Sequence, residues 1–332
     1  MAKIYIFAFY TGKCSKIYLK GVKMVSGVSL SQVNPYQVEQ PQKEKKNIGR
    51  KIAGVVTGAA VYKAVPAIHT PFALRCVDKM QKINGSLARE EAETVSNALT
   101  KTLEMSGLKD KGIEIVRASA KNSAEVTELL SKEMGGNLVT KVMPKQFLKA
   151  QVDAARQMVE QGCNAAYLSK SKKILMPDGN KFALAGFHEA GHAMNANLGK
   201  LTNLLQKSRK LTILALPIVA IGLLKKPKAE GEKPQGAWDK TTTFIQKNAG
   251  ILTASTFLPT IAEEGLATLK GNQYAKKLLD PEIAKKVVKA NKYGMATYVA
   301  MAAVFGVAAH LAIKAKNAIA HPELKQQKVQ NC

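Results

Sequence analysis

The amino-acid sequence predicts a mostly helical α+β protein, with a small sheet and several apolar helices. Apolar residues recur at helical spacing through most of the chain, whereas the pattern typical of strands is confined to residues 113–116 and 167–176. The 332 residues are 46% apolar, which is enough for one large domain or two modest ones.

We expect the chain to consist of five consecutive segments. They are a disordered leader (1–47), an apolar and basic helical segment (48–85), an α+β core (86–200), a helical hairpin (201–275), and an apolar helix with a basic tail (276–332). Within the core, glycines at 107 and 135–136 end two helices, and a further helix is expected over Lys145–Glu160.

The expected chemistry centres on His188-Glu189-Ala190-Gly191-His192. Histidines four residues apart lie on the same face of a helix, so both imidazoles can reach one metal ion. Bound Zn²⁺ lowers the pKa of a water toward about 7, and Glu189 can then take the proton of that water. The motif predicts a zinc-dependent hydrolase, and the alternative is a pair of structural histidines on a buried helix.

A third metal ligand would favour the hydrolase. Glu263 and Glu264 lie in an otherwise apolar, helix-compatible segment, and carboxylates are seldom buried unless they are paired or metal-bound. The other interpretation is a helix N-terminus at Pro259-Thr260, whose dipole both carboxylates would complement. Gly191 and Gly265 favour the metal site, because two glycines would allow the helices to approach closely.

The motif at 188–192 followed by Glu264-Gly265-Leu266-Ala267 resembles the gluzincin group of zinc metallopeptidases. The resemblance covers about residues 145 to 275 and implies a zincin-like core that binds one Zn²⁺ and hydrolyses peptides or proteins. Residues 164–168 and 173–177 resemble the edge strand that binds substrate beside the active-site helix. The apolar segments resemble those of CAAX prenyl proteases and heat-shock membrane peptidases. Those relatives carry an acidic residue soon after the third ligand, whereas Gly265-Leu266-Ala267 is the pattern of soluble members.

The resemblance implies that His188, His192 and Glu264 bind zinc. Glu189 is then the general base, and it passes the proton to the leaving amine. Glu263 is expected to face solvent or a lysine, because helical neighbours differ by about 100° in direction. The group that stabilises the oxyanion is left open among three candidates: Tyr274, Tyr293 and His310.

The chain carries 50 Lys and Arg against 24 Asp and Glu, a formal charge of +26. Such an excess indicates contact with nucleic acid or with an anionic membrane. The basic residues flank the apolar segments and do not alternate with aromatic residues, so we expect a membrane as partner and no nucleic acid.

Two apolar segments bear on this expectation. Residues 211–224 are too few to cross a bilayer comfortably, and Pro217 would kink a helix there. Gly294–Ile313 has 20 residues without formal charge and is the best transmembrane candidate. The alternative is a buried, alanine-rich core helix.

The four cysteines are isolated and show no metal-binding spacing, so free thiols in a reducing, intracellular environment are expected. They are Cys14, Cys76, Cys163 and Cys332.

The sequence as a whole favours a membrane-associated zinc metalloendopeptidase. One rival is a catalytically silent zinc-binding scaffold in the membrane, against which Glu189 argues, since a structural metal site needs no base. A second rival is a soluble peptidase whose apolar segments form its core.

Overall fold

The computed structural model describes residues 43–135, 144–179, 182–229 and 231–322, which form two compact units. Unit 1 contains the described parts of 68–212 and 256–302, and unit 2 contains those of 43–67, 213–255 and 303–322. The five segments expected from the sequence are intervals along the chain, whereas each unit joins distant intervals. The expected leader lies almost wholly outside the described residues.

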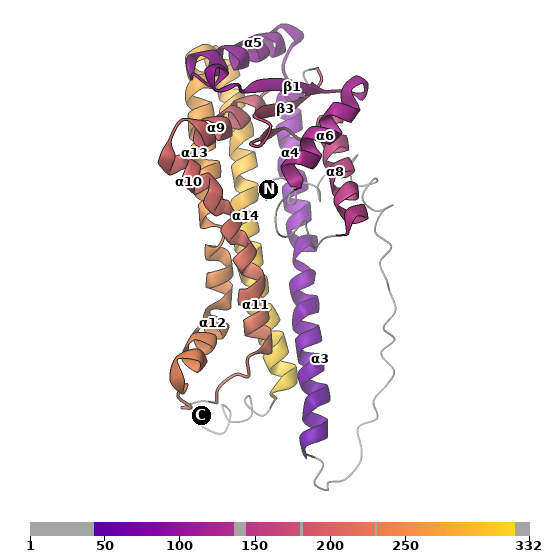
Figure 1. Cartoon of the computed structure of the whole chain (residues 1–332), viewed down its shortest axis with the longest axis vertical. Helices are drawn as coiled ribbons and strands as arrows, with labels where there is room; N and C mark the ends of the chain where they lie inside the picture. The colour runs from indigo at the N-terminus through magenta and orange to yellow at the C-terminus, as the bar shows by residue number, and fades with distance from the viewer. Residues whose placement is uncertain (1–42, 136–143, 180–181, 230, 323–332) are drawn as a thin grey trace. The chain divides into compact units, whose positions relative to one another are not determined.

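The expectation of a mostly helical chain with a small sheet is confirmed (Figure 1). The elements of unit 1 are α4 (Val65–Gly85, whose first residues belong to unit 2), α5 (Arg89–Met105), β1 (Glu114–Ala118), α6 (Ser123–Met134), α8 (Lys145–Glu160), β2 (Ala166–Leu168), β3 (Lys173–Pro177), α9 (Ala185–Asn197), α10 (Lys200–Ser208), α13 (Leu258–Leu278) and the first part of α14 (Pro281–Ala320). The bounds of α8 are those expected from the sequence.

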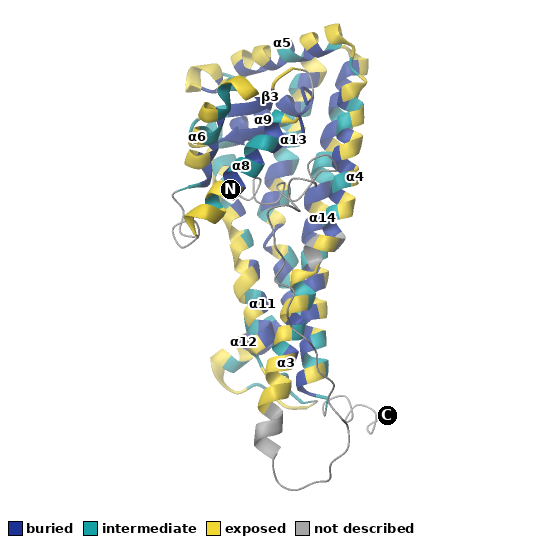
Figure 2. Cartoon of the chain, turned by 90° about the vertical axis from the view of Figure 1, so that its right-hand side faces the viewer, coloured by how far each residue is buried: buried dark blue, intermediate teal, exposed yellow. Residues whose placement is uncertain are grey.

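The sheet has the order β1-β3-β2, with β1 parallel and β2 antiparallel to β3. Its side chains alternate between two apolar cores, as the period of a strand requires. Leu168 and Leu175 pack with α6 and α8 on one face, whereas Tyr167 and Ile174 pack toward α9 on the other. The burial pattern in Figure 2 follows this arrangement, with β3 and α9 among the most buried elements. The strand β2 is therefore an edge strand beside the histidine helix.

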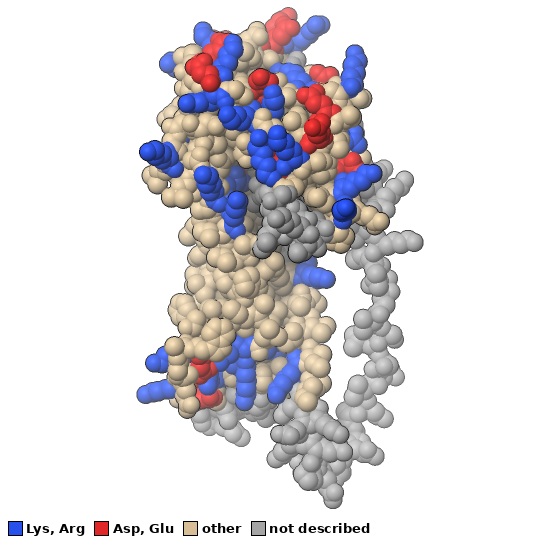
Figure 3. Space-filling model, in the orientation of Figure 1, with Lys and Arg blue, Asp and Glu red and all other residues tan. Residues whose placement is uncertain are grey.

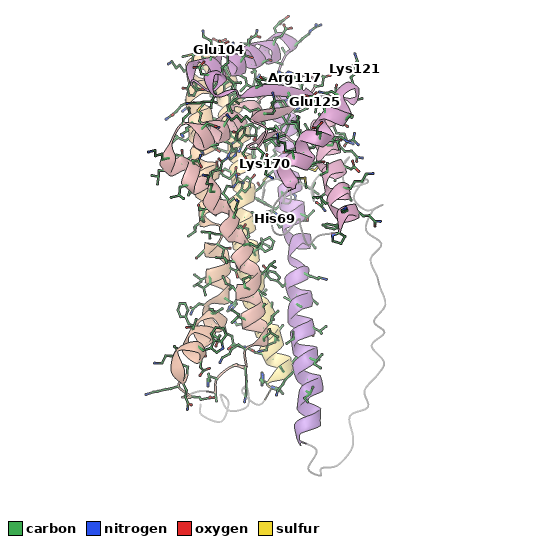
Figure 4. All side chains as sticks on the ribbon, viewed as in Figure 1. His69, Glu104, Arg117, Lys121, Glu125 and Lys170 are labelled. Carbon is green, nitrogen blue, oxygen red and sulfur yellow. The ribbon has the colours of Figure 1, made fainter. Side chains whose placement is uncertain are left out.

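The turn between β2 and β3 is anchored on α6. The carboxylate of Glu133, at the end of α6, accepts hydrogen bonds from Ser169 Oγ (3.0 Å) and from the backbone N–H of Lys170 (2.9 Å; labelled in Figure 4). Buried Glu133 thereby fixes the end of the edge strand.

Helices α9 and α13 lie backbone against backbone. A Cβ at Gly191 would be 2.0 Å from the carbonyl oxygen of Ala267, and one at Gly271 would be 2.3 Å from that of Phe187. The close approach expected at Gly191 is thus present, but its counterpart is Gly271 rather than Gly265. A Cβ at Gly265 would meet only Met295 Cε at 3.8 Å, an ordinary contact.

The described part of unit 2 is helical and consists of α3 (Lys43–Lys63), α11 (Ala215–Leu224), α12 (Gly236–Ser255) and the last part of α14. Its core includes Val219, Leu223, Ala249, Ala309 and Ala312. Pro217 was expected to kink a helix over 211–224, a stretch that changes from 3₁₀ to α-helix at Ala215. It lies in the first turn of α11, where a missing N–H breaks no hydrogen bond within the helix.

Cys76 and Cys163 are buried free thiols, as expected. Cys14 and Cys332 lie outside the described residues.

Candidate metal centre

The two histidines and one of the two glutamates meet at a single point of unit 1. His188 Nε2 and His192 Nε2, on α9, lie 3.0 Å apart. Glu264 Oε2, on α13, lies 3.1 Å from the first of these nitrogens and 3.3 Å from the second. The structure therefore brings together the three ligands that the sequence predicts, although 72 residues separate His192 from Glu264.

These separations fit a bound metal ion. A tetrahedral zinc site with bonds of about 2.0–2.1 Å places its ligand atoms about 3.3–3.4 Å apart. The three donor atoms observed here are 3.0–3.3 Å apart, so they are spaced much like three corners of such a tetrahedron.

The second nitrogen of each imidazole is also bound. His192 Nδ1 lies 2.6 Å from Glu263 Oε1, and His188 Nδ1 lies 3.1 Å from Thr268 Oγ1. An ionised carboxylate only accepts hydrogen bonds, so His192 carries its proton on Nδ1 and presents the Nε2 lone pair to the centre. Such partners behind the ligands orient them and raise their basicity.

Glu263 does not face solvent, and the expectation that it does is wrong. Its side chain is fully buried and lies beside His192 Nδ1, Arg209 and Asn195, whose Nδ2 is 3.1 Å away. The directions of Glu263 and Glu264 do diverge, but the close approach of α13 to α9 lets both reach His192. Glu264 meets Nε2 of that ring and Glu263 meets Nδ1.

Arg209 completes the centre, and the sequence analysis did not identify it. This residue begins the 3₁₀ segment Arg209–Leu214 and is buried. Its Nη1 lies 2.8 Å from Glu263 Oε2, and its Nη2 lies 2.9 Å from Glu264 Oε1. One guanidinium therefore bridges both carboxylates. The only signal in the sequence was the basic pair Arg209-Lys210 before the apolar residues 211–224.

The charged groups of the centre shift one another's pKa values. Burial alone would lower the pKa of Arg209, but Glu264 and Glu263 outweigh burial and raise this pKa above its ordinary value. Burial alone would raise the pKa of Glu263, but His192 and Arg209 outweigh burial and lower it. Both groups are thus held in their charged forms.

The summed charge of the centre calls for a cation. Glu189, Glu263 and Glu264 are buried carboxylates, and Arg209 is the buried cation that bridges two of them. One buried cation thus faces three buried carboxyl groups. Isolated charge is costly to bury, so a divalent cation at the three donor atoms would balance the cluster.

Glu189 follows His188 on α9 and makes a different contact. Its Oε2 accepts a hydrogen bond of 2.7 Å from the backbone N–H of Tyr167 on β2. Glu189 and His188 both line a cavity of about 30 Å³, which is large enough to hold a water molecule. The carboxylate is therefore placed beside space for a water.

The three oxyanion candidates lie in other surroundings. Tyr274 packs into two apolar cores, the ring of Tyr293 lies 5.2 Å from Lys79 Nζ, and His310 is an exposed residue of unit 2. Tyr298 of α14, which the sequence analysis missed, lines the same cavity as His188 and Glu189. Tyr298 lies within a long apolar run, so the sequence pattern did not distinguish it from core residues.

Comparison of the chain with protein-family models, curated proteins and solved structures found no match. The function is therefore argued from the centre itself.

Proposed function

We propose that this protein is a zinc-dependent metalloendopeptidase of gluzincin type, built on a zincin-like core. The carrying observation is the meeting of His188, His192 and Glu264, whose donor atoms all lie within 4.8 Å of one another. Two nitrogens, one oxygen and an open position are the donor set of catalytic zinc sites.

Bound zinc would supply a water of lowered pKa and would polarise the scissile carbonyl. Glu189 would take the proton from that water and give it to the leaving amine. The hydrogen bond from Tyr167 N–H orients this carboxylate, and burial keeps bulk water away from it. Tyr298 replaces the earlier candidates as the side chain proposed to donate to the oxyanion, because it shares the cavity with Glu189.

The edge strand supports a peptide as substrate. β2 has one neighbour in the sheet, and an extended chain would pair with its other edge once that edge, which is buried and donates Tyr167 N–H to Glu189, is uncovered. Tyr167 N–H points toward Glu189, and a peptide added at this edge would pass close to the proposed base.

The second candidate is a zinc-binding scaffold without activity. A structural metal site needs no base beside its ligands, and the hydrogen bond from Tyr167 N–H could be accepted by a neutral side chain at lower cost than by a buried carboxylate. The burial of Glu189 therefore favours the enzyme.

Membrane association is part of the proposal. α14 has 40 residues and is the one described helix that is long and apolar enough to cross a membrane. Half of its most apolar window is buried, and the core helix of a soluble protein can meet the same criterion. The buried thiols Cys76 and Cys163 agree with a reducing environment.

The decisive variant is Glu189→Gln, which keeps the shape of the side chain but removes the proton acceptor. Hydrolysis of a quenched-fluorescent peptide library should fall by a factor of about 10² to 10⁴. Elemental analysis should still find one zinc per chain, because Glu189 is not a ligand. The matched control is Glu125→Gln, an exposed residue of α6, which should keep full activity.

Full activity of Glu189→Gln would refute the mechanism. A native chain that binds zinc but cleaves no peptide in the library would support the scaffold instead.

A further inference from the structure

Large apolar side chains point outward from all four helices of unit 2. Among the described residues, they include Ile52 and Val56 (60% and 62% exposed) on α3, Leu216 (62%) on α11, Phe244 and Ile251 (57% and 72%) on α12, and Val307 and Leu311 (59% and 49%) on α14. A helical bundle in water shows the reverse pattern, with polar residues outside. We call these seven residues the apolar belt.

The interior of unit 2 contains small residues where its helices meet. A Cβ at Gly58 of α3 would lie 2.7 Å from the carbonyl oxygen of Ala312, and one at Gly54 would lie 2.8 Å from that of Lys316. A Cβ at Gly250 of α12 would likewise lie 2.9 Å from the carbonyl oxygen of Gly306. Backbone contact through glycines four residues apart, as at Gly54 and Gly58, is typical of helices packed in a membrane.

Charged residues gather at one end of unit 2. Lys225, directly after α11, pairs with Asp239 in the first turn of α12. Lys316 Nζ, near the end of α14, donates to the backbone carbonyl of Lys225. Arg50 and Lys51 lie in the N-terminal half of α3, near Gly54 and its contact with Lys316. In Figure 3, the blue and red side chains of the region labelled α11 and α12 in Figure 1 cluster at its lower end, below a surface without charge.

We propose that unit 2 is a four-helix bundle inserted in a lipid bilayer, with the apolar belt against acyl chains. Its charged end would lie at a layer of anionic headgroups, to which the surplus of lysines is complementary. This inference concerns α3, α11 and α12 as well as α14, and it does not depend on the proposed peptidase activity.

The uncharged lengths within unit 2 reach about the middle of a bilayer. The run from Tyr293 to Ile313 has 21 uncharged residues, of which the 11 at 303–313 belong to unit 2. The corresponding runs in unit 2 are 11 residues at 52–62, 12 at 213–224 and 8 at 248–255. At about 1.5 Å per residue these runs are about 12 to 18 Å long, against about 15 Å for half of the hydrocarbon core.

The single tryptophan of the chain marks the expected headgroup level. Trp238 is 75% exposed at the start of α12, directly before Asp239 and Lys240. Tryptophan is enriched where membranes meet water. Ile251 follows 13 residues later, about 20 Å further along the helix.

The test uses tryptophan fluorescence in the full chain, with Trp238→Phe as background. Single tryptophans replace exposed belt residues on α3, α11, α12 and α14 in turn. The background carries Val56→Trp, Leu216→Trp, Ile251→Trp or Leu311→Trp, and each replaced side chain is about half exposed or more. The matched control is Phe147→Trp at a half-exposed position of α8 in unit 1. Each variant is placed in phosphatidylcholine–phosphatidylglycerol vesicles whose acyl chains carry bromine, which quenches fluorescence on contact.

All four belt variants should lose roughly half of their fluorescence or more, whereas Phe147→Trp should be unchanged. In the native chain, Trp238 should be quenched by bromine near the headgroups rather than by bromine deep in the chains. Quenching of Leu311→Trp alone would mean that only α14 spans the bilayer. Quenching of no belt variant would mean that protein covers the belt. Either result would overturn the proposal, as would equal quenching of Phe147→Trp.

Discussion

Both ring nitrogens of His192 contact a glutamate, and the two adjacent glutamates therefore have different roles. Glu264 meets Nε2, which faces the donor cluster, whereas Glu263 meets Nδ1 on the far side of the ring. Under the proposed function, Glu263 would act on a bound metal through the imidazole and through Arg209, without being a ligand.

Substitution of the two glutamates should separate these tasks. Glu264→Ala removes one of three protein ligands, so zinc and activity should both be lost. Glu263→Gln keeps the shape but removes the charge behind His192, and zinc affinity should fall about 10- to 100-fold. Zinc titration monitored by calorimetry measures both effects. An exposed Glu263 would have been dispensable for zinc binding. Because Glu263 is buried and contacts His192, we now expect its substitution to weaken zinc binding.

Glu125→Gln is the control for both variants. If Glu263→Gln lost zinc completely and Glu264→Ala kept it, the third ligand would be Glu263 rather than Glu264.

Arg209 should be a major determinant of stability. Arg209→Ala would leave Glu263 and Glu264 buried beside each other without their shared cation, at a cost of about 3–5 kcal/mol in the free energy of unfolding. Arg209→Lys should recover only part of this loss, because an ammonium cannot bridge two carboxylates with a planar fork.

Thermal unfolding with and without zinc measures this effect. Added zinc should stabilise Arg209→Ala more than the native chain, because the metal neutralises the same carboxylates. Equal stability of Arg209→Ala and the native chain would contradict the proposed charge balance.

At the scale of elements, the contact between α9 and α13 holds the centre together, since each helix contributes ligands. Gly191 and Gly271 are the points where no side chain fits. Their backbones touch the partner helix, so the separation of the two helices, and with it that of the ligands, is set by glycine.

Gly271→Ala should therefore lower both stability and zinc affinity. Its Cβ would lie 2.3 Å from the carbonyl oxygen of Phe187, so α13 must move away from the helix that carries both histidines. Gly265→Ala is the matched control on the same helix. Its Cβ meets nothing closer than 3.8 Å, and alanine should stabilise a helix by about 0.5–1 kcal/mol. Denaturant unfolding and zinc titration compare the two, and equal behaviour would refute the role of Gly271.

For the whole molecule, the exposed apolar surface of unit 2 governs solubility. We expect the full chain to resist extraction from membranes by alkaline carbonate and to require detergent. Leu311→Lys, on the apolar belt, should make the chain easier to extract, because a charge at the middle of a membrane helix costs about 2.5–3.5 kcal/mol. Phe147→Lys in unit 1 should change nothing. Release of the native chain by carbonate would indicate that α14 is a core helix of a soluble protein and does not cross a membrane.

Much of the molecule followed from local pattern. Helix α8, strand β1 and the paired histidines follow periodicities of 3.6 or 2 residues, which are visible within one segment of sequence. Residues 173–177, expected as part of the edge strand, form the central strand β3, and only β2 is the edge. Glu264 was found through a resemblance between motifs. The two units were not foreseen, because each is assembled from intervals far apart in the chain.

The sequence by itself determined that two histidines share one face of a helix, with a carboxylate beside them, because i and i+4 coincide on any α-helix. Only the tertiary structure decided what stands behind those ligands. Glu263, Thr268 and Arg209 join the centre because α13 packs on α9 at the distance that glycine permits, and because the segment after α10 folds back over both carboxylates. Such contacts depend on how helices approach in space, and a linear pattern does not encode that approach.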